Sequence, residues 1–228
     1  MKQLEATSLS KYKGFIFDID GTMIDSMKVH LKAWQKVLEK YGCHYTMKEV
    51  GELAYGINPE IVKRALGDHL TDEEIEMISN EKEVLFRESF DPEEDVIKGF
   101  IHFIVEWFNK KIPLVIGSAA PSDNIDFFMD RLGIGHYFKG AISEESVTKG
   151  KPSPEVFLKA AKLINVPIEQ CVVFEDSPSG AEASGKAGSD TIAVLTTKTK
   201  KDFDEIPRVV GYIQDYRALL TSEGIETQ

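Results

Sequence analysis

The chain has few cysteines and no long apolar segment. Its 228 residues include two cysteines, Cys43 and Cys171, and neither lies in the pattern of a disulfide framework or a metal cluster. No segment approaches the ~20 consecutive apolar residues that a membrane-spanning helix needs. Residues 1–13 are polar and lack the apolar stretch of a signal peptide. We therefore expect a soluble protein of the cytoplasm.

Basic residues are outnumbered by acidic ones. The 27 lysines and arginines stand against 38 aspartates and glutamates, which gives a formal net charge of −11. Proteins that bind nucleic acids or anionic lipids present basic surfaces, so this balance argues against both kinds of partner. A small phosphorylated metabolite needs only a local cationic pocket. The hydrophobic fraction of 42% is high enough for a buried core, which argues against a disordered chain.

Short apolar runs that end at polar residues predict the strands of a sheet. They span residues 14–17, 112–116, 171–174 and 191–195. Runs that are apolar on both faces are typical of parallel strands covered by helices. Helical spacing occurs between them, as in residues 124–132, and Ser153-Pro154 and Ser177-Pro178 are each typical of an N-cap followed by the first helical residue. We predict a doubly wound, Rossmann-like α/β domain.

Residues 26–94 break this alternation of strands and helices. His30, Trp34 and Leu38 lie on one face of a first predicted helix. Capping-box signatures predict two further helix starts, at Thr46 with Glu49 and at Thr71 with Glu74. Another helix is expected after Asn58-Pro59. The pattern predicts an all-helical cap over residues 26–94, inserted into an α/β core made of residues 1–25 and 95–228.

The side chains that carry chemistry lie just after the predicted strands or in a loop before a helix. Ligands of open α/β sheets bind outside the carboxyl ends of the strands, so these positions are the informative ones. In chain order the set comprises Asp18, Asp20, Ser118, Lys151, Glu175 and Asp176. It contains carboxylates, one hydroxyl and one ammonium.

This set of side chains suits phosphoryl transfer. Asp18 and Asp20 repel each other unless a cation or a proton relieves them, and Mg²⁺ binds through one or two carboxylates plus substrate phosphate. Asp176 is placed to supply the second carboxylate. A transferring phosphoryl group needs metal, ammonium and hydroxyl donors. A carboxylate can attack phosphorus while a second one moves protons, which predicts an aspartyl-phosphate intermediate.

Four motifs resemble those of the haloacid dehalogenase superfamily and occur in the same order. They are residues 15–22, Ser118 after Ile116-Gly117, Lys151-Pro152-Ser153-Pro154, and Glu175-Asp176-Ser177 with Gly180. A further set makes the chain similar to the β-phosphoglucomutase-like branch, in which a helical cap follows the first motif. That set is Asp25-Ser26, His30, Ala33 and Trp34. The resemblance covers nearly the whole chain.

The resemblance implies a role for each motif residue. Asp18 is implied as the nucleophile and a Mg²⁺ ligand. Asp20 is implied as the general acid and base, and its backbone carbonyl as a further metal ligand. Ser118 and Lys151 are implied to bind the transferring phosphoryl group. Asp176, with Glu175, is implied to complete the metal site. On its own, Ser118 also suits a helix cap and Asp176 the positive end of a helix.

Substrate binding is assigned by the same resemblance to His30, Gly56, Lys82 and Ala119. His30 is expected near the hinge and close to Asp20, and Lys82 is expected to reach toward the substrate from the last cap helix. Alternatives remain open for four positions. His30 and Trp34 also suit packing between cap and core, and Lys82 also suits the surface. Glu175 could orient a metal-bound water instead of binding the metal.

Two positions separate the activities found in the superfamily. Dehalogenases, phosphonate hydrolases and P-type ATPases lack a carboxylate at the position of Asp20, so dehalogenation is disfavoured. Sugar-phosphate mutases have an arginine three residues after the cap-loop glycine, and this chain has Pro59 there. Proline has no charge and no donor with which to grip a second phosphate. Hydrolysis is therefore favoured over mutase activity.

We accordingly predict a monomeric, Mg²⁺-dependent phosphatase of small phosphate monoesters, above all sugar phosphates. The alternatives are a β-phosphoglucomutase-type isomerase and an inorganic pyrophosphatase of the same fold. A signalling receiver module also uses Asp, Mg²⁺, a hydroxyl and Lys. Receiver modules are shorter and lack a helical cap. Their phosphorylated Asp follows an interior strand, whereas Asp18 follows the first predicted strand of this chain.

Overall fold

A computed structural model describes residues 6–54 and 58–220. The chain divides into two compact units, one formed by residues 1–25 and 96–228 and the other by residues 26–95. We call them the core and the cap. The second boundary thus lies one residue beyond the position that the sequence suggested.

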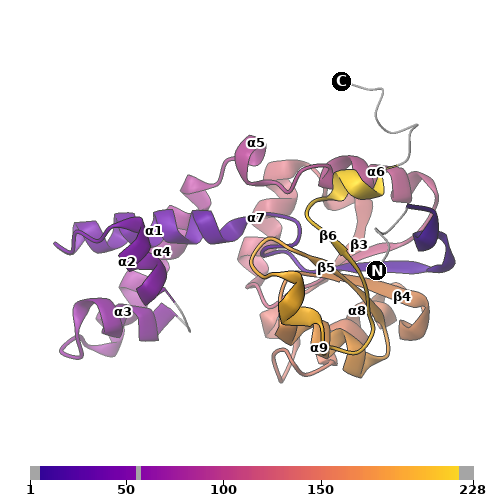
Figure 1. Cartoon of the computed structure of the whole chain (residues 1–228). Helices are drawn as coiled ribbons and strands as arrows, with labels where there is room; N and C mark the ends of the chain where they lie inside the picture. Colours follow the sequence, from indigo (N-terminus) through magenta and orange to yellow (C-terminus); the bar gives the residue numbers. More distant parts are fainter. Residues whose placement is uncertain (1–5, 55–57, 221–228) are drawn as a thin grey trace. The chain divides into compact units, whose positions relative to one another are not determined.

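The core contains a six-stranded, entirely parallel sheet with the order β3-β2-β1-β4-β5-β6. Figure 1 labels four of its strands, β3, β4, β5 and β6, and the helices of the core. The strands are β1 (Gly14–Phe17), β2 (Leu114–Gly117), β3 (Phe138–Ile142), β4 (Cys171–Glu175), β5 (Asp190–Val194) and β6 (Val209–Ile213). This arrangement confirms the predicted doubly wound α/β fold.

The register of the central strands brings the polar residues after them to one edge of the sheet. Phe17 of β1 pairs with Ile116 of β2 on one side and with Phe174 of β4 on the other. Asp18 therefore follows a central strand and lies between the carboxyl ends of β2 and β4. Its amide donates to the Phe174 carbonyl at 3.1 Å, which fixes the backbone at this point.

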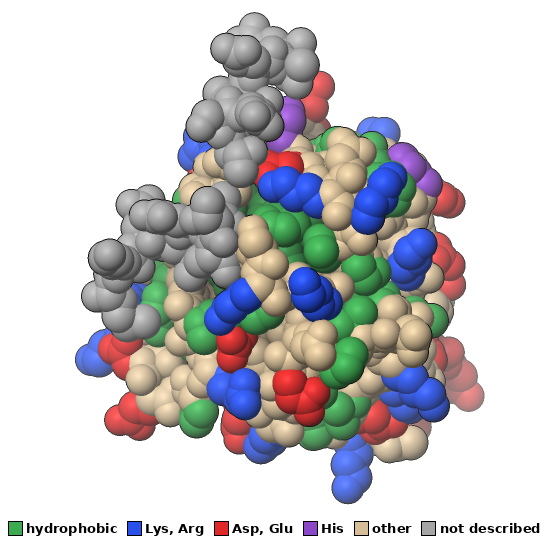
Figure 2. All heavy atoms as spheres, turned by 90° about the vertical axis from the view of Figure 1, so that its right-hand side faces the viewer, with side chains coloured by type: hydrophobic (Ala, Val, Ile, Leu, Met, Phe, Trp, Pro, Cys, Tyr) green, Lys and Arg blue, Asp and Glu red, His purple; other side chains and the backbone are tan. Residues whose placement is uncertain are grey.

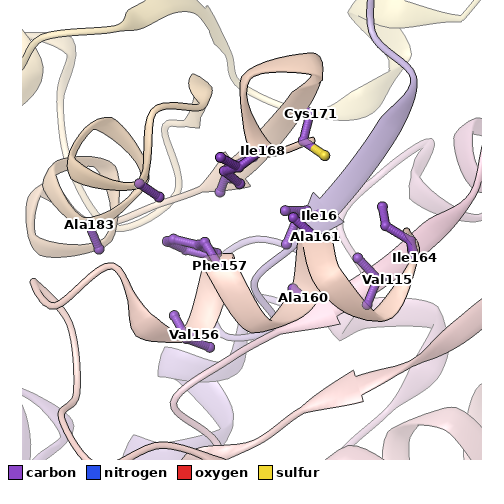
Figure 3. Packing of buried hydrophobic residues seen from close by; sticks show 12 residues of the cluster. Ile16, Val115, Val156, Phe157, Ala160, Ala161, Ile164, Ile168, Cys171 and Ala183 are labelled. Atoms are coloured by element: carbon purple, nitrogen blue, oxygen red, sulfur yellow. The ribbon is translucent and has the colours of Figure 1, made fainter. Parts of the chain in front are cut away.

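Helices cover the sheet on both faces. The α-helices of the core are α6 (Phe100–Asn109), α7 (Ser122–Leu132), α8 (Glu155–Leu163) and α9 (Pro178–Ala187) over the described residues. Phe157 and Ala161 of α8 pack with Ile16 of β1 in one apolar cluster (Figure 3). Aromatic rings form a second cluster, in which Phe17 and Phe174 stack at 4.8 Å and Phe103 of α6 lies against both. Because an apolar cluster covers each face of the sheet, the side chains on both faces of these strands are apolar.

The described part of the cap contains helices and no strand. They are α1 (Ser26–Lys40), α2 (Met47–Leu53), α3 (Asn58–Leu66), α4 (Asp72–Ser89) and α5 (Pro92–Asp95). Both predicted capping boxes are present, at the starts of α2 and α4. Trp34, Leu38 and Ile78 belong to the buried cluster to which α1, α2, α3 and α4 all contribute.

The structure corrects two details of the sequence analysis. Strands β3 and β6 were not predicted; both lie at the edges of the sheet, and their exposed or glycine positions interrupt the apolar pattern. Ser153 is not the N-cap of α8, because the helix begins at Glu155 with Pro154 in the cap position. Ser177 does cap α9, accepting from the Gly180 amide at 3.0 Å with Pro178 as the first helical residue.

The surface carries charges of both signs. Figure 2 shows one face of the molecule, on which basic and acidic side chains are interspersed among apolar ones. Over the described residues, every helix is too short or too polar to cross a membrane.

Candidate active site

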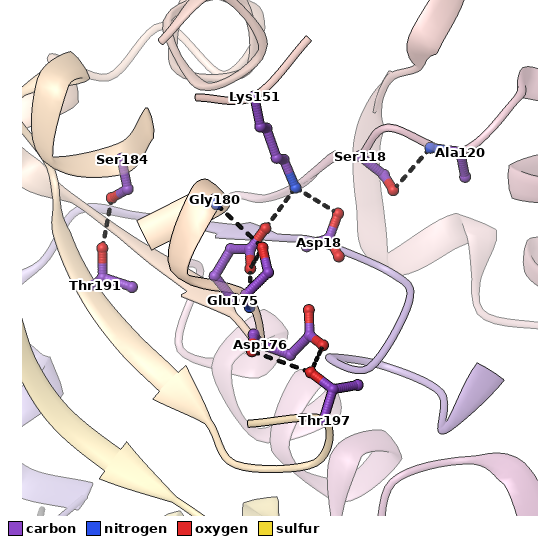
Figure 4. A network of polar contacts seen from close by, with 11 residues as sticks. Asp18, Ser118, Ala120, Lys151, Glu175, Asp176, Gly180, Ser184, Thr191 and Thr197 are labelled. Atoms are coloured by element: carbon purple, nitrogen blue, oxygen red, sulfur yellow. Dashed lines mark hydrogen bonds and ion pairs between the residues drawn. The ribbon is translucent and has the colours of Figure 1, made fainter. Parts of the chain in front are cut away.

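Lys151 connects two carboxylates that come from different strands. Its Nζ donates to Asp18 Oδ1 at 2.7 Å and to Glu175 Oε1 at 2.6 Å (Figure 4). The side chains of Asp18, Glu175 and Lys151 are 7%, 1% and 10% exposed. Three of the residues predicted from the motifs therefore form one buried ionic cluster.

The second carboxylate oxygen of Glu175 accepts hydrogen bonds from Ser177, the N-cap of α9. Glu175 Oε2 accepts from the Ser177 amide at 2.6 Å and from the Ser177 hydroxyl at 2.9 Å. Gly180 leaves room for the carboxylate, because a Cβ there would lie 1.7 Å from Glu175 Oε1. Both oxygens of Glu175 thus have donors, and the side chain orients Lys151.

Asp176 is held by the loop after β5. Its Oδ2 accepts from the Thr197 hydroxyl at 2.5 Å, and a Cβ on Gly21 would lie 2.2 Å from the same oxygen. Gly21 has a φ of 69°, in the left-handed region that favours glycine. The hydroxyl of Thr196 donates to the Gly21 carbonyl. The motifs do not include Thr196 and Thr197, although both directly follow an apolar run that predicts a strand.

The loop before Lys151 is organised by the first residue of α8. Glu155 Oε2 accepts from the amides of Thr148 and Lys149 at 3.0 and 3.1 Å, and from the Thr148 hydroxyl at 2.8 Å. An ion pair with Lys159 and the Thr148 hydroxyl lower the pKa of Glu155 to about 2. Glu155 therefore remains ionised and holds the loop two residues ahead of Lys151.

Burial, followed by the charges of neighbouring groups, shifts the pKa values of the cluster. Burial raises the pKa of Asp18 to about 7 against the lowering effect of Lys151, and Glu175 and Asp20 raise it further. Burial raises the pKa of Asp176 to about 8, with contributions from Glu175 and Asp18. Burial lowers the pKa of Lys151, but Asp18 and Glu175 more than offset that effect, so its net shift is upward. Lys151 is therefore charged throughout the physiological range.

This donor set fits a divalent cation. Carboxylate oxygens of Asp18, Glu175 and Asp176 lie within 4.8 Å of one another, and these are the described residues that form such a group. One ammonium faces three carboxylates, which leaves two negative charges when all are ionised. Oxygen ligands of this kind are those that Mg²⁺ prefers. The Asp20 carboxylate is not part of the group, and metal binding through the Asp20 carbonyl stays a prediction.

Ser118 lies after β2 on the same edge of the sheet. Its amide donates to the Ile142 carbonyl at 3.0 Å, and its side chain is buried. Ser118 Oγ accepts from the Ala120 amide at 3.2 Å, which leaves the hydroxyl hydrogen to donate elsewhere (Figure 4). Ala119 is exposed between them. These positions are compatible with the predicted phosphoryl-binding roles, which no contact in the structure tests.

The cap residues form a separate cluster. Lys82 Nζ lies 2.7 Å from His30 Nδ1 and 2.9 Å from Glu83 Oε1, and the His30 ring stacks on Phe86 with centroids 4.0 Å apart. Lys82 is 2% exposed, so it is not a surface lysine. The reach of His30 and Lys82 toward a substrate stays a prediction. Gly56 lies outside the described residues.

Comparisons with known proteins agree on one family. A family model described as haloacid dehalogenase-like hydrolase matches residues 15–194. The chain is 29% identical over 184 residues to the fructose-1-phosphate phosphatase YqaB of Escherichia coli, with 81% of this chain and 97% of the relative covered. It is 27% identical over 190 residues to the beta-phosphoglucomutase of Bacillus subtilis, with 80% and 83% covered.

A solved structure is similar over almost the full length. The crystal structure of a HAD hydrolase, family IA, variant 3, from Entamoeba histolytica superimposes with a TM-score of 0.79 at 25% sequence identity. The superposition covers 93% of this chain and 96% of that chain. The architecture described above is therefore that of a known group of hydrolases.

Proposed function

The chain belongs to the haloacid dehalogenase-like hydrolase family, and we propose that it is a Mg²⁺-dependent phosphatase of small sugar phosphates that works through an aspartyl-phosphate on Asp18. The family and its β-phosphoglucomutase-like branch are those predicted from the motifs, and that prediction is confirmed. The prediction of a phosphoric monoester hydrolase is likewise confirmed by the phosphatases among the relatives.

One observation carries the mechanistic proposal. Asp18, Glu175, Asp176 and Lys151 converge at the carboxyl edge of the sheet, where three carboxylates face a single ammonium. A phosphoryl group brings further negative charge, so a cation is needed beside Lys151 to hold it. Asp18 and Asp176 would hold that cation with the Asp20 carbonyl, and Glu175 lies beside them. When bound, Mg²⁺ supplies the positive charge that neutralises the phosphoryl oxygens.

The first step transfers the phosphoryl group to the enzyme. An Asp18 carboxylate oxygen attacks phosphorus, and the bond between phosphorus and the leaving alcohol oxygen breaks. Asp20 donates a proton to that oxygen, so the alcohol leaves neutral. Lys151 and the Ser118 hydroxyl donate hydrogen bonds to the phosphoryl oxygens. The charge that moves from the leaving group onto these oxygens is stabilised by donors that are already in place.

The second step releases phosphate. Asp20, now ionised, takes a proton from a water molecule that attacks the phosphorus of the aspartyl-phosphate. The bond between phosphorus and Asp18 breaks, inorganic phosphate departs, and both aspartates return to their starting states.

Sugar phosphates are the substrate class that the relatives support. One relative is named a fructose-1-phosphate phosphatase and another a phosphorylated carbohydrates phosphatase. The test is phosphate release across sugar phosphates, nucleotides and inorganic pyrophosphate, each with Mg²⁺ and with EDTA. Metal-dependent release from sugar phosphates supports the proposal, and release from pyrophosphate alone replaces it with a pyrophosphatase.

A mutase is the second candidate, since the beta-phosphoglucomutase of Bacillus subtilis is also a relative. Pro59 counts against it, because a mutase must grip two phosphates and proline cannot donate to either. Incubation with β-glucose 1-phosphate and a bisphosphate primer separates the two activities. Free phosphate without glucose 6-phosphate supports the phosphatase, whereas glucose 6-phosphate formation supports the mutase.

A further inference from the structure

The loop after β5 contributes two hydroxyl groups to the candidate active site. Thr197 Oγ1 donates to Asp176 Oδ2 at 2.5 Å and lies 3.3 Å from the Asp176 carbonyl. Thr196 Oγ1 donates to the carbonyl of Gly21, in the loop that carries Asp20. Neither threonine belongs to the four motifs. Two consecutive side chains thus join the loops after β1, β4 and β5.

Two neighbours confine the same oxygen of Asp176. Thr197 donates to Oδ2 from one side, and Gly21 approaches it so closely that a Cβ would lie 2.2 Å away. Figure 4 shows the Asp176 carboxylate between Thr197 and Asp18. With Oδ2 held in this way, rotation of the carboxylate is restricted. The second oxygen is left for a ligand in the group that Asp176 forms with Asp18 and Glu175.

We propose that Thr197 is a positioning residue for the metal site: its hydroxyl fixes the Asp176 carboxylate so that the other oxygen is presented to a divalent cation. This inference rests on the proposed Mg²⁺ site. The hydrogen bond favours the ionised carboxylate, which is the form that binds metal. Thr196 anchors the loop, so the Thr197 hydroxyl stays in place when Asp176 binds its ligand.

The location of Thr197 separates this role from a packing role. The residue is exposed, so replacing its hydroxyl with a methyl group opens no cavity in the core. Thr197→Val keeps the shape and removes the donor, and Thr197→Ser restores the donor. Thr199→Val is a matched control in the same loop, because Thr199 Oγ1 bonds to Asp202 at 2.7 Å and not to the metal-binding group.

The test is calorimetric titration of the metal-free protein with Mg²⁺. Partners that orient metal ligands contribute about 10–100-fold in affinity, so we expect Thr197→Val to weaken Mg²⁺ binding by about tenfold or more. Thr197→Ser and Thr199→Val should bind like the wild type. In activity assays, Thr197→Val should need more Mg²⁺ for half-maximal rate while keeping most of its rate at saturating Mg²⁺.

The outcomes distinguish this inference from the proposed function. Wild-type protein that binds no Mg²⁺ overturns the metal site and, with it, the role of Thr197. Wild-type binding with unchanged affinity in Thr197→Val overturns the positioning role alone, as does an equal loss in Thr199→Val. Thermal melts establish that the variants fold, and Thr197→Ala replaces Thr197→Val if that variant does not.

Discussion

A methyl group on Gly180 would lie 1.7 Å from Oε1 and 2.0 Å from Cδ of Glu175, so the first turn of α9 and the carboxylate occupy adjoining space. The same Oε1 accepts from Lys151 at 2.6 Å. The orientation of the lysine therefore depends on the absence of a side chain at position 180, which gives a physical reason for glycine in the fourth motif.

Gly180→Ala should displace Glu175 and release Lys151. We expect a loss of stability of about 1–3 kcal/mol, the usual effect of overpacking, together with a large fall in kcat/KM. Gly51→Ala is the control, because nothing lies within 4 Å of a Cβ at that position of α2. It should stabilise the protein by roughly 0.5–1 kcal/mol through helix propensity. Equal effects of the two substitutions in chemical denaturation would contradict this account of Gly180.

Lys151→Met should remove the cationic partner of Asp18 and Glu175. The loss of one preorganised donor to a transition state typically costs about 10²–10³ in rate, and we expect a fall in kcat of at least that size. Lys162→Met is the control, since Lys162 is exposed on α8. Steady-state kinetics at saturating Mg²⁺ compare kcat of the two variants. If kcat of Lys151→Met equals that of Lys162→Met, Lys151 has no role in phosphoryl transfer.

The metal-free protein should lose stability as the pH rises from about 5 to 8. Asp18 and Asp176 have folded-state pKa values raised from 3.8 to about 7 and about 8, chiefly by burial. The folded state therefore retains protons that the unfolded chain releases above its own carboxyl pKa. In that window each such group lowers the free energy of unfolding by up to about 1.4 kcal/mol per pH unit.

Thermal melts in EDTA across this pH range measure the effect. Mg²⁺ should raise the melting temperature more at pH 8 than at pH 5, because it binds the ionised carboxylates. Asp18→Asn should flatten the pH dependence in EDTA. A melting temperature that stays level or rises from pH 5 to 8 without metal would contradict the assigned pKa shifts.

The sequence predicts those strands whose local apolar pattern matches their burial in the folded protein. Strands β1, β4 and β5 are buried on both faces, so their apolar runs are clear. Strand β3 alternates between half-buried and exposed positions and contains Lys139 and Gly140, and β6 contains Gly211. Their pairing with β2 and β5 makes them strands, and that pairing is a long-range property that no short window contains.

The sequence predicts those residues of the candidate site that belong to the four motifs. Asp18, Lys151, Glu175 and Asp176 carry charges that need partners when buried, which makes them conspicuous at strand ends and in loops. Thr196 and Thr197 are ordinary loop residues by type. The rule that selects residues after parallel strands also applies to them, but only the contacts with Gly21 and Asp176 distinguish them from other loop threonines.

Phosphate release by Asp18→Asn tests the central claim most directly. The wild type and the variant are assayed with a sugar phosphate that the wild type hydrolyses, with Mg²⁺ and with EDTA, after thermal melts have shown that both are folded. The account predicts release by the wild type in Mg²⁺ only and no release by the variant, since the amide cannot attack phosphorus. Release by Asp18→Asn at the wild-type rate, or undiminished release in EDTA, would contradict it.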